Sequence, residues 1–419
     1  MKVLVVGSGG REHALAWALA RSAAVDTVVA APGNPGIAGV APCVELADAL
    51  AEVETFDLVI IGPEQPLVDG LADEISDLGV PVFGPSRAAA HLEGSKAWMK
   101  EVAAAVEVPT ARHAAFDHTH EEAALAFLET LPGLYVVKTD GLAAGKGVIV
   151  TESLSEARDA VRSYLSGASF GEAGRTVVIE EGMRGPELSL LALCDGTTRA
   201  VALPPAQDFK RIGDDDAGPN TGGMGAYSPV PVAGDDVVDL VMSRAVEPTL
   251  AELARRDIEY RGVLYAGLML TTEGPKLVEF NIRFGDPECQ VVVPRLASDL
   301  FTHCMEAATG RLITPVRAID DACVGVVLAT EGYPVTTRTG DVIEGLDRVA
   351  ELDDVIVFHA GTARSGDDIV TAGGRVLDVV ATGPTIEVAR ARAYDAVEQI
   401  SWPGMQYRTD IAAGVASTV

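Results

Sequence analysis

The fold is best indicated by the segment Lys276-Leu277-Val278-Glu279-Phe280-Asn281-Ile282-Arg283-Phe284-Gly285-Asp286-Pro287-Glu288. Apolar and polar residues alternate strictly over positions 278–284, which is the period of a half-buried β-strand. Because residues two apart on a strand share a face, we expect Glu279, Asn281 and Arg283 to project together. The segment therefore predicts a strand with one apolar and one polar face, followed at once by a turn.

The polar face of this strand suits a site for a metal ion and a phosphate. A carboxylate beside a carboxamide oxygen is a pair of hard ligands for Mg²⁺, which usually completes its octahedron with waters and substrate phosphates. Arg283 is placed to hold a phosphate or a developing oxyanion. The alternative is an ordinary strand with a solvated polar face, but asparagine is depleted in strands. We therefore predict a metal site at Glu279 and Asn281.

Length and composition indicate a globular protein of several domains. The chain has 419 residues, of which 48% are hydrophobic, enough for large cores in two to four domains. The sequence contains no apolar run of about twenty residues, so we predict no transmembrane helix. The segment Met1–Gly7 is too short for a signal peptide, so we expect a cytoplasmic protein. Its five cysteines form no Cys-x-x-Cys pair, which favours reduced thiols.

The chain is strongly acidic, with a formal net charge of −29. Such a field repels nucleic acids and anionic membranes, so we expect neither as a partner. It also repels phosphate-bearing substrates, so any phosphate site must be a local concentration of positive charge and backbone amides. The acidity also suggests adaptation to a salty cytoplasm, and activity that collapses as KCl rises would count against that hypothesis.

The first ninety residues alternate strand and helix patterns. This β-α-β rhythm predicts a parallel sheet, whose ligands bind at the carboxyl ends of the strands. Those ends are Gly7–Arg11, Pro32–Gly36 and Gly62–Glu64. The expected elements are strands Val3–Val6, Thr27–Ala30, Leu58–Ile61 and Val80–Phe83, and helices Glu12–Arg21 and Leu67–Leu78.

The first glycine loop does not match a dinucleotide-binding fingerprint. The G-x-G-x-x-G spacing requires glycine at position 12, which is Glu12, and Ala30–Gly33 lacks the acidic residue that holds a ribose. A glycine turn that leads into a helix N-terminus suits a single phosphate group instead. We therefore predict a phosphate site at Gly9, Gly10 and Arg11, with a purely structural tight turn as the alternative.

The rest of the chain divides into a middle region, 93–312, and a small mixed α/β region, 313–419, after an N-terminal domain over 1–92. The expected middle elements are helix Lys96–Ala105, strands Tyr135–Lys138 and Val148–Val150, helix Leu154–Leu165, strands Val177–Glu180 and Leu188–Cys194, a long polar loop over Gln207–Ser228, helix Val237–Arg255 and strand Val263–Leu270. The expected C-terminal elements are strands Val324–Ala329, Val355–His359 and Arg375–Ala381 and helix Ile386–Ile400.

Two loops of the middle region are rich in small residues. The loop after Lys138 contains Lys146 and small residues that let backbone amides approach phosphate oxygens, although its spacing is not that of a P-loop. The loop over 207–228 is too long and glycine-rich for idle packing and predicts a binding loop or lid. A flexible hairpin and a disordered insertion are the respective alternatives.

Carboxylates and histidines of the middle region carry weaker signals. Glu180, Glu181 and Glu187 could accept hydrogen bonds from adenine or ribose. The alternative, to which we give equal weight, is that they lie in solvated turns. His113, His118 and His120 cluster around Asp117 in a predicted polar connecting segment without further ligands, so we do not predict a metal site there.

Five motifs resemble the phosphoribosylamine–glycine ligases, a family of ATP-grasp enzymes of purine synthesis. The similarity runs in order along nearly the whole chain, and the long glycine-methionine loop is its most specific part. The motifs are Gly-Ser-Gly-Gly-Arg-Glu-His-Ala (7–14), Leu-Glu-Gly-Ser-Lys (92–96), Asp-Gly-Leu-Ala-Ala-Gly-Lys-Gly-Val (140–148), Gly-Pro-Asn-Thr-Gly-Gly-Met-Gly-Ala-Tyr-Ser-Pro (218–229) and Arg-Phe-Gly-Asp-Pro-Glu (283–288).

The resemblance implies a fold, a reaction and cofactors. The fold would be a multidomain α/β and α+β protein with an N-terminal Rossmann-like pre-ATP-grasp domain, ATP-grasp domains with a lid at about 110–178, and a small mixed C-terminal domain. ATP, glycine and 5-phosphoribosylamine would give glycinamide ribonucleotide, ADP and phosphate through glycyl phosphate, with Mg²⁺ or Mn²⁺ as cofactor. Apart from the resemblance, we expect a monomer or a weak homodimer.

The resemblance also implies roles for individual residues. ATP would contact Lys96, Lys138, Gly145, Lys146, Gly147, Glu180, Glu181 and Glu187. The substrates would contact Gly9, Gly10, Arg11, Glu64, Asp208, Lys210, Asn220, Gly222 and Gly223. Metal ligands would be Glu279 and Asn281, and the catalytic residues Arg283 and Asp286.

Two departures and three rival hypotheses accompany the resemblance. The strand before the metal motif lacks the additional acid of many ATP-grasp proteins, and Phe209 stands where the family segment has histidine. The rivals are a ligase for another acid and amine, a dinucleotide-dependent oxidoreductase, and a nucleotide-binding protein without catalytic activity.

Overall fold

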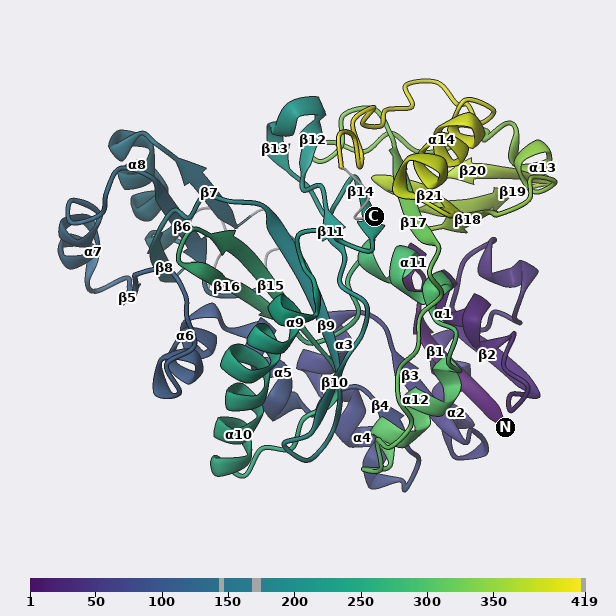
Figure 1. Ribbon diagram of the computed structural model, residues 1–419, viewed down its shortest axis with the longest axis horizontal. Helices are drawn as coiled ribbons and strands as arrows, with labels where there is room; N and C mark the ends of the chain where they lie inside the picture. Colours follow the sequence, from purple (N-terminus) through teal and green to yellow (C-terminus); the bar gives the residue numbers. More distant parts are fainter. Residues whose placement is uncertain (143–146, 168–174, 416–419) are drawn as a thin grey trace.

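The apolar runs of the first ninety residues form a parallel sheet of order β2-β1-β3-β4 (Figure 1). The computed structural model describes residues 1–142, 147–167 and 175–415. The elements of this N-terminal domain are β1 (Lys2–Gly7), α1 (Gly10–Leu19), β2 (Thr27–Pro32), η1 (Ile37–Gly39), α2 (Leu46–Ala51), η2 (Val53–Thr55), β3 (Leu58–Ile61), α3 (Glu64–Asp69), α4 (Leu71–Asp77), β4 (Val82–Phe83) and α5 (Arg87–Gly94).

The single helix predicted over Leu67–Leu78 is wrong. Two helices, α3 and α4, meet at Gly70, whose φ of 96° lies in the left-handed region that favours glycine. A Cβ on Gly70 would lie 2.5 Å from the Arg87 guanidinium. Backbone conformation and close packing therefore break the helical pattern that its apolar residues suggest.

The centre of the molecule is an antiparallel sheet of order β10-β9-β15-β16. Its elements and the helices around it are α6 (Lys96–Ala105), β9 (Glu187–Asp195), β10 (Ala200–Ala202), α9 (Asp235–Val241), η5 (Met242–Val246), α10 (Glu247–Arg255), β15 (Arg261–Thr271), β16 (Gly274–Asn281), α11 (Glu288–Val292), η6 (Val293–Arg295) and α12 (Leu300–Ala308). The predicted helix Val237–Arg255 is continuous, but its middle turn, η5, is a π-helix.

Strand β16 is shorter than the alternating pattern predicts. It ends at Asn281 rather than at residue 284, and it contains a bulge, because Glu279 pairs with Gly267 whereas Leu277 pairs with Leu268. Arg283 therefore lies beyond the strand. It still turns toward the same side, since its Nη2 donates to Asn281 Oδ1 at 3.5 Å.

A separate lobe at the left of Figure 1 is built on a sheet of order β5-β8-β6-β7. It has its own apolar core, which includes Leu128, Val137, Val161 and Ile179. Its elements are β5 (His113–Asp117), α7 (Glu121–Leu128), β6 (Tyr135–Thr139), β7 (Val148–Thr151), α8 (Leu154–Leu165) and β8 (Thr176–Glu181). The lobe packs largely within itself.

The histidine segment predicted as a polar connection is partly strand β5. His120 pairs with Asp117 on the surface, with Nδ1 and Oδ1 2.9 Å apart. Over residues 1–142, 147–167 and 175–415, no group of three or more His, Cys, Asp or Glu residues is arranged to hold a metal ion.

The C-terminal domain is a mixed domain whose main sheet has the order β11-β14-β17-β21-β18. The predicted long loop over Gln207–Ser228 is wrong, because that segment forms four short strands, two of which join this sheet. The elements are β11 (Gln207–Asp208), β12 (Arg211–Gly213), η4 (Asp214–Asp216), β13 (Ala217–Asn220), β14 (Gly225–Ser228), β17 (Ala322–Ala329), α13 (Leu346–Val349), β18 (Val355–His359), β19 (Thr362–Ser365), β20 (Asp368–Thr371), β21 (Arg375–Gly383) and α14 (Ile386–Val397).

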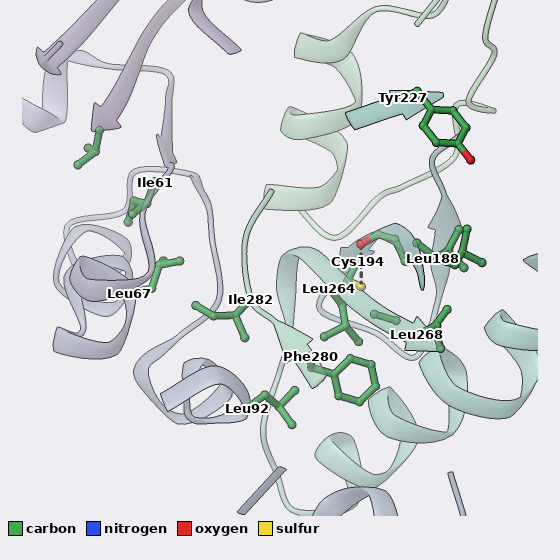
Figure 2. Close-up of a cluster of buried hydrophobic side chains, with 14 of the residues drawn as sticks. Ile61, Leu67, Leu92, Leu188, Cys194, Tyr227, Leu264, Leu268, Phe280 and Ile282 are labelled. Atoms are coloured by element: carbon green, nitrogen blue, oxygen red, sulfur yellow. Dashed lines mark hydrogen bonds between the residues drawn. The ribbon is translucent and has the colours of Figure 1, made fainter. Parts of the chain in front are cut away.

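One large apolar cluster extends from the N-terminal domain to the central sheet. Figure 2 shows Ile282 between Leu67, from α3, and Phe280, from β16, with Leu92 of α5 nearby. This packing fixes the chain that follows β16 against the N-terminal domain. None of the helices in the described ranges combines the length and apolar character needed to cross a bilayer.

Candidate active site

A cleft of about 890 Å³ lies where the central sheet meets the lobe of β5–β8, the N-terminal domain and the C-terminal domain. Most of the residues predicted from sequence line it. These are Arg11, Glu64, Lys96, Lys138, Gly147, Glu180, Glu181, Glu187, Asp208, Lys210, Asn220, Gly222, Glu279, Asn281, Arg283 and Asp286. Gly145 and Lys146 lie outside the described residues, and Gly9, Gly10 and Gly223 are not part of the lining.

Strand β16 presents a pair of hard oxygen ligands to the cleft. Burial raises the pKa of Glu279, but the charges of Lys210 and Lys138 outweigh this effect and bring the pKa below its usual value. Asn281, 8% exposed, adds a carboxamide oxygen from the same strand end. Gly267 faces Glu279 across the ladder, so no further acid stands there. The donor set fits a divalent ion that takes its other ligands from phosphates and water.

A buried ion triad supports the lysine of β6. Glu180 is 2% exposed, and its carboxylate oxygens lie 2.9 Å from Lys138 Nζ and 3.0 Å from Lys100 Nζ. Burial raises the pKa of Glu180, but the two ammonium groups lower it further, so the carboxylate stays charged. Lys138 also donates to the carbonyl of Val278, at 3.2 Å. The triad therefore fixes a positive charge beside β16.

Sequence reasoning missed Lys100. Burial lowers its pKa to about 8. It lies one helical turn after Lys96 on α6, and this i, i+4 spacing was the available signal. Lys96 donates to the Gly141 carbonyl at 3.1 Å and lines the cleft, and burial lowers its pKa too. Helix α6 thus contributes two cations to this part of the molecule.

Two carboxylates hold Arg283. Its Nη2 lies 3.1 Å from Glu93 Oε1, and its Nε lies 3.3 Å from Glu64 Oε2. The other oxygen of Glu93 accepts a hydrogen bond from the backbone N–H of Ile282 at 2.9 Å. Burial raises the pKa of Glu93 despite the guanidinium. Glu93, which sequence reasoning passed over, therefore orients the arginine from the end of α5.

The turn after β16 is held by the C-terminal domain. Asp286 Oδ2 lies 2.8 Å from Arg375 Nη2, and its Oδ1 accepts from Gln290 at 2.6 Å. Burial raises the pKa of Asp286, but Arg375 and Arg11 outweigh this and hold it below its usual range. Arg375 also donates to the Gly222 carbonyl at 2.6 Å. The position of Asp286 thus depends on its contact with Arg375, which no local pattern in the sequence predicts.

A second acidic group lies deeper in the cleft. Glu288, which is part of the sequence motif but was assigned no role, accepts hydrogen bonds from Ser189 at 2.9 Å and from Tyr265 at 2.8 Å.

The ammonium group of Lys210 is paired with an acid in the cleft. Lys210 Nζ lies 2.7 Å from Glu187. Burial lowers the pKa of Lys210, but Glu187 and Asp208 outweigh it and raise the pKa well above its usual value, so the ammonium remains charged.

The N-terminal glycine loop is arranged differently from the expected phosphate cradle. The backbone N–H of Gly9 donates to Glu12 Oε2 at 2.6 Å, and Arg11 Nε lies 2.6 Å from Glu12 Oε1. The Arg11 guanidinium also donates to the carbonyl of Phe284 at 3.1 Å. Glu12 therefore accepts the hydrogen bond of the amide that a phosphate would use. Of the residues predicted in this domain, Arg11 and Glu64 line the cleft.

A buried acid behind the site should make stability depend on pH. Asp378 is 2% exposed, and neither carboxyl oxygen has a hydrogen-bond partner among the described residues. Burial, assisted by the charge of Asp286 and opposed by Arg375, raises the pKa of Asp378 well above its usual value. The folded state thus keeps a proton that the unfolded state releases, so the free energy of unfolding falls as pH rises above about 4.

We expect Asp378→Asn to remove this dependence and to gain stability over the parent as pH rises from about 4.5 to 8, by about 1–3 kcal/mol at the upper end. Thermal unfolding across this range measures the difference. Asp368→Asn, at an exposed position of β20, is the matched control and should show no such trend. A stability difference between Asp378→Asn and parent that is the same at every pH would contradict the account.

Models of one protein family match the chain in three consecutive stretches. They are described as the N domain, the ATP-grasp (A) domain and the C domain of phosphoribosylglycinamide synthetase, and match residues 1–93, 94–289 and 323–414. The phosphoribosylamine–glycine ligase of Brucella melitensis is 50% identical over 98% of this chain and 97% of its own length. That of Streptomyces coelicolor is 50% identical over 99% of this chain and 100% of its own.

Solved structures agree. The crystal structure of phosphoribosylamine–glycine ligase from Thermotoga maritima superposes with a TM-score of 0.86 at 34% identity, covering 98% of this chain and 100% of that one. A biotin carboxylase domain from Hydrogenobacter thermophilus, at 18% identity and a TM-score of 0.74 over 97% of this chain and 91% of that one, shares the fold alone. The chain belongs to the phosphoribosylglycinamide synthetase family.

Proposed function

We propose that the protein joins glycine to 5-phosphoribosylamine in purine biosynthesis and converts ATP to ADP and phosphate. The observation that carries the proposal is the single cleft in which Lys96 and Lys138, Glu279 and Asn281, and Arg283 meet. Positive charges suited to phosphates thus lie beside hard oxygen ligands and beside an arginine held by two acids. The names of the relatives at about 50% identity support the choice of substrates.

Glu279 and Asn281 would hold a divalent ion, Mg²⁺ or Mn²⁺, which when bound neutralises charge on the ATP phosphates. Lysine side chains of the protein would add positive charge at the same phosphates. Lys138, fixed by Glu180, and Lys96 are positioned to bind phosphate oxygens.

The rest of the proposed ATP site comes from a loop and two acids. Gly147 lines the same cleft and, with Gly145 and Lys146, belongs to the proposed phosphate loop. Glu181 and Glu187 are the proposed partners of adenine and ribose.

The reaction requires two transfers. In the first, a glycine carboxylate oxygen attacks the γ-phosphorus, the bond to the ADP oxygen breaks, and glycyl phosphate forms. In the second, the amine of 5-phosphoribosylamine attacks the glycyl carbon, and phosphate departs with the electron pair of the C–O bond. Arg283 is assigned to the negative charge on phosphate and on the tetrahedral oxyanion. Glu93 and Glu64 hold this arginine in place.

The substrate residues of the proposal come from several domains. Arg11 and Glu64, from the N-terminal domain, would meet the phosphoribosyl group. Asp208 and Asp286 are candidates to bind the glycine ammonium, and Lys210, Asn220, Gly222 and Gly223 complete the proposed set of substrate residues.

The lobe of β5–β8 is proposed as a lid over about 110–178, and its closure would exclude water from the reactive anhydride. We also propose that the protein acts in the cytoplasm, as a monomer or weak homodimer.

Release of ADP tests the proposal. Purified protein is given Mg²⁺ with ATP, glycine and freshly generated 5-phosphoribosylamine, and each substrate is omitted in turn. We expect release only with all three. Release that does not require glycine, or that accepts another amine equally well, would favour a different carboxylate–amine ligase. ATP binding without release under any combination would favour a nucleotide-binding protein without catalytic activity.

A further inference from the structure

Part of the cleft wall is a small hairpin, formed by β12 and β13, whose turn conformation is held by residues outside the hairpin. Strands β12 and β13 pair through an irregular register, and Arg211, Asp216 and Asn220 of the segment line the cleft. At its turn, Asp215 and Asp216 both adopt positive φ, 56° and 53°. Non-glycine residues in this region persist when surrounding structure restrains them. Contacts that restrain these two residues come from outside the hairpin.

The restraint is a buried arginine nearly two hundred residues further along the chain. Arg408 is 1% exposed, and its Nη1 donates to Asp216 Oδ1 at 2.7 Å and to the carbonyl of Arg211 at 3.2 Å. Its Nε and Nη2 donate to the two oxygens of Asp410 at 2.7 and 2.6 Å. Fork geometry of this kind fixes direction as well as distance. Arg408 therefore holds one side of the hairpin in place.

The residues after Arg408 hold the other side of the turn. Thr409 donates to Asp214 from its backbone N–H at 2.8 Å and from its hydroxyl at 2.5 Å. The backbone N–H of Asp215 donates to Asp410 Oδ2 at 2.9 Å. All three aspartates of the turn thus bond to the short segment Arg408–Asp410.

This segment is itself anchored to helix α14. The hydroxyl of Tyr394 donates to the carbonyl of Arg408 at 2.8 Å, and Arg390 donates to the carbonyl of Thr409 at 2.6 Å. The backbone N–H of Ile411 donates to the Tyr394 hydroxyl at 3.1 Å. The hairpin is therefore fixed to a helix of the C-terminal domain through a chain of short bonds.

The same arginine contacts the base of the hairpin. Its guanidinium lies over the ring of Phe209, 4.9 Å from the ring centre, in cation–π geometry. Next along the chain, the carbonyl of Lys210 accepts from the Thr221 N–H at 2.7 Å. Lys210, whose ammonium faces the cleft, is thus fixed by the structure that Arg408 supports.

We propose that the segment Arg408–Ile411 is a strut that sets the position of the hairpin and of Lys210 in the cleft wall. Arg408 is its positioning residue and acts through Asp216 and Phe209, without contact to the reacting atoms. The activity arm of its test rests on the proposed ligation, whereas the structural arm does not.

The structural arm compares hydrogen exchange of backbone amides in the full-length parent, Arg408→Met and the control Arg244→Met, which alters an exposed arginine of η5. In Arg408→Met we expect amides of residues 211–221 to exchange about tenfold faster, while amides of β15 keep the parent rate. The control should match the parent throughout. Unchanged exchange of the hairpin in a folded Arg408→Met protein would overturn the proposal.

The activity arm is a double-mutant cycle of Arg408→Met and Asp216→Asn, assayed well below the unfolding temperature. Each single variant should lower kcat/KM about tenfold, chiefly through KM, and the double variant should lose no more than Arg408→Met alone. Losses that simply multiply would overturn the proposed route through Asp216. If Arg408→Met does not fold, Asp216→Asn alone carries the exchange measurement. If the parent shows no ligation, hydrogen exchange still decides the structural claim.

Discussion

Glu279→Ala should lower kcat/KM for ligation by about 10³-fold, or about 4 kcal/mol of transition-state stabilisation, without unfolding the protein. Glu279 supplies the charged member of the proposed metal pair, and no neighbouring acid of β15 can replace it, because Gly267 stands opposite. The side chain is only partly buried, so its removal leaves no large cavity. The measurement is steady-state ADP release over a range of Mg²⁺ concentrations, together with a thermal unfolding curve.

Glu273→Ala provides a matched control. Glu273 lies in the exposed turn that joins β15 to β16 and pairs with Lys276 at 2.6 Å on the surface. Exposed pairs of this kind contribute little to stability, so this variant should keep the parent activity and Mg²⁺ dependence. Retention of more than about one tenth of the parent kcat/KM by Glu279→Ala would rule out the metal site as assigned.

Arg283→Met should lower kcat by about 10²–10³-fold, since it removes the donor assigned to the developing oxyanion. It should also destabilise the protein by about 3–5 kcal/mol, because the Glu93 side chain, which is only 10% exposed, would be left without its cation. A loss of activity in this variant alone could thus reflect unfolding.

The double variant Arg283→Met/Glu93→Gln separates the two effects. Glutamine keeps an oxygen for the backbone N–H of Ile282 and removes the buried charge, so much of the lost stability should return. The rate should not return, because the oxyanion still lacks its donor. Single-turnover rates and unfolding midpoints of parent, single and double variants measure this. Recovery of kcat along with stability would show that Arg283 is structural.

Local patterns predicted the elements that carry the chemistry. Helix α6 begins at Lys96 and ends at Ala105, as its periodicity indicates, and α8 also has its predicted bounds. The alternation along β16 placed Glu279 and Asn281 at one strand end. These features depend on side-chain period and on capping residues such as Ser95, which act over a few residues and are therefore visible in one sequence.

Features that depend on distant partners were missed. The segment 207–228 joins the C-terminal sheet because β14 pairs with β17, about a hundred residues away. Arg375 reaches Asp286 from the same domain, and Glu93 meets Arg283 only when α5 packs beside β16. The occupation of the Gly9 amide by Glu12 likewise depends on the folded loop. Long-range pairing of this kind leaves no period in the sequence.

The central claim is that glycine is activated as its acyl phosphate in this cleft, and transfer of an oxygen atom tests it most directly. Glycine labelled with ¹⁸O in both carboxylate oxygens is supplied with ATP and 5-phosphoribosylamine, and the phosphate formed is analysed by mass spectrometry. The account predicts one ¹⁸O atom in each phosphate, because the attacking carboxylate oxygen leaves with phosphorus. Phosphate without ¹⁸O, formed together with glycinamide ribonucleotide, would contradict the account.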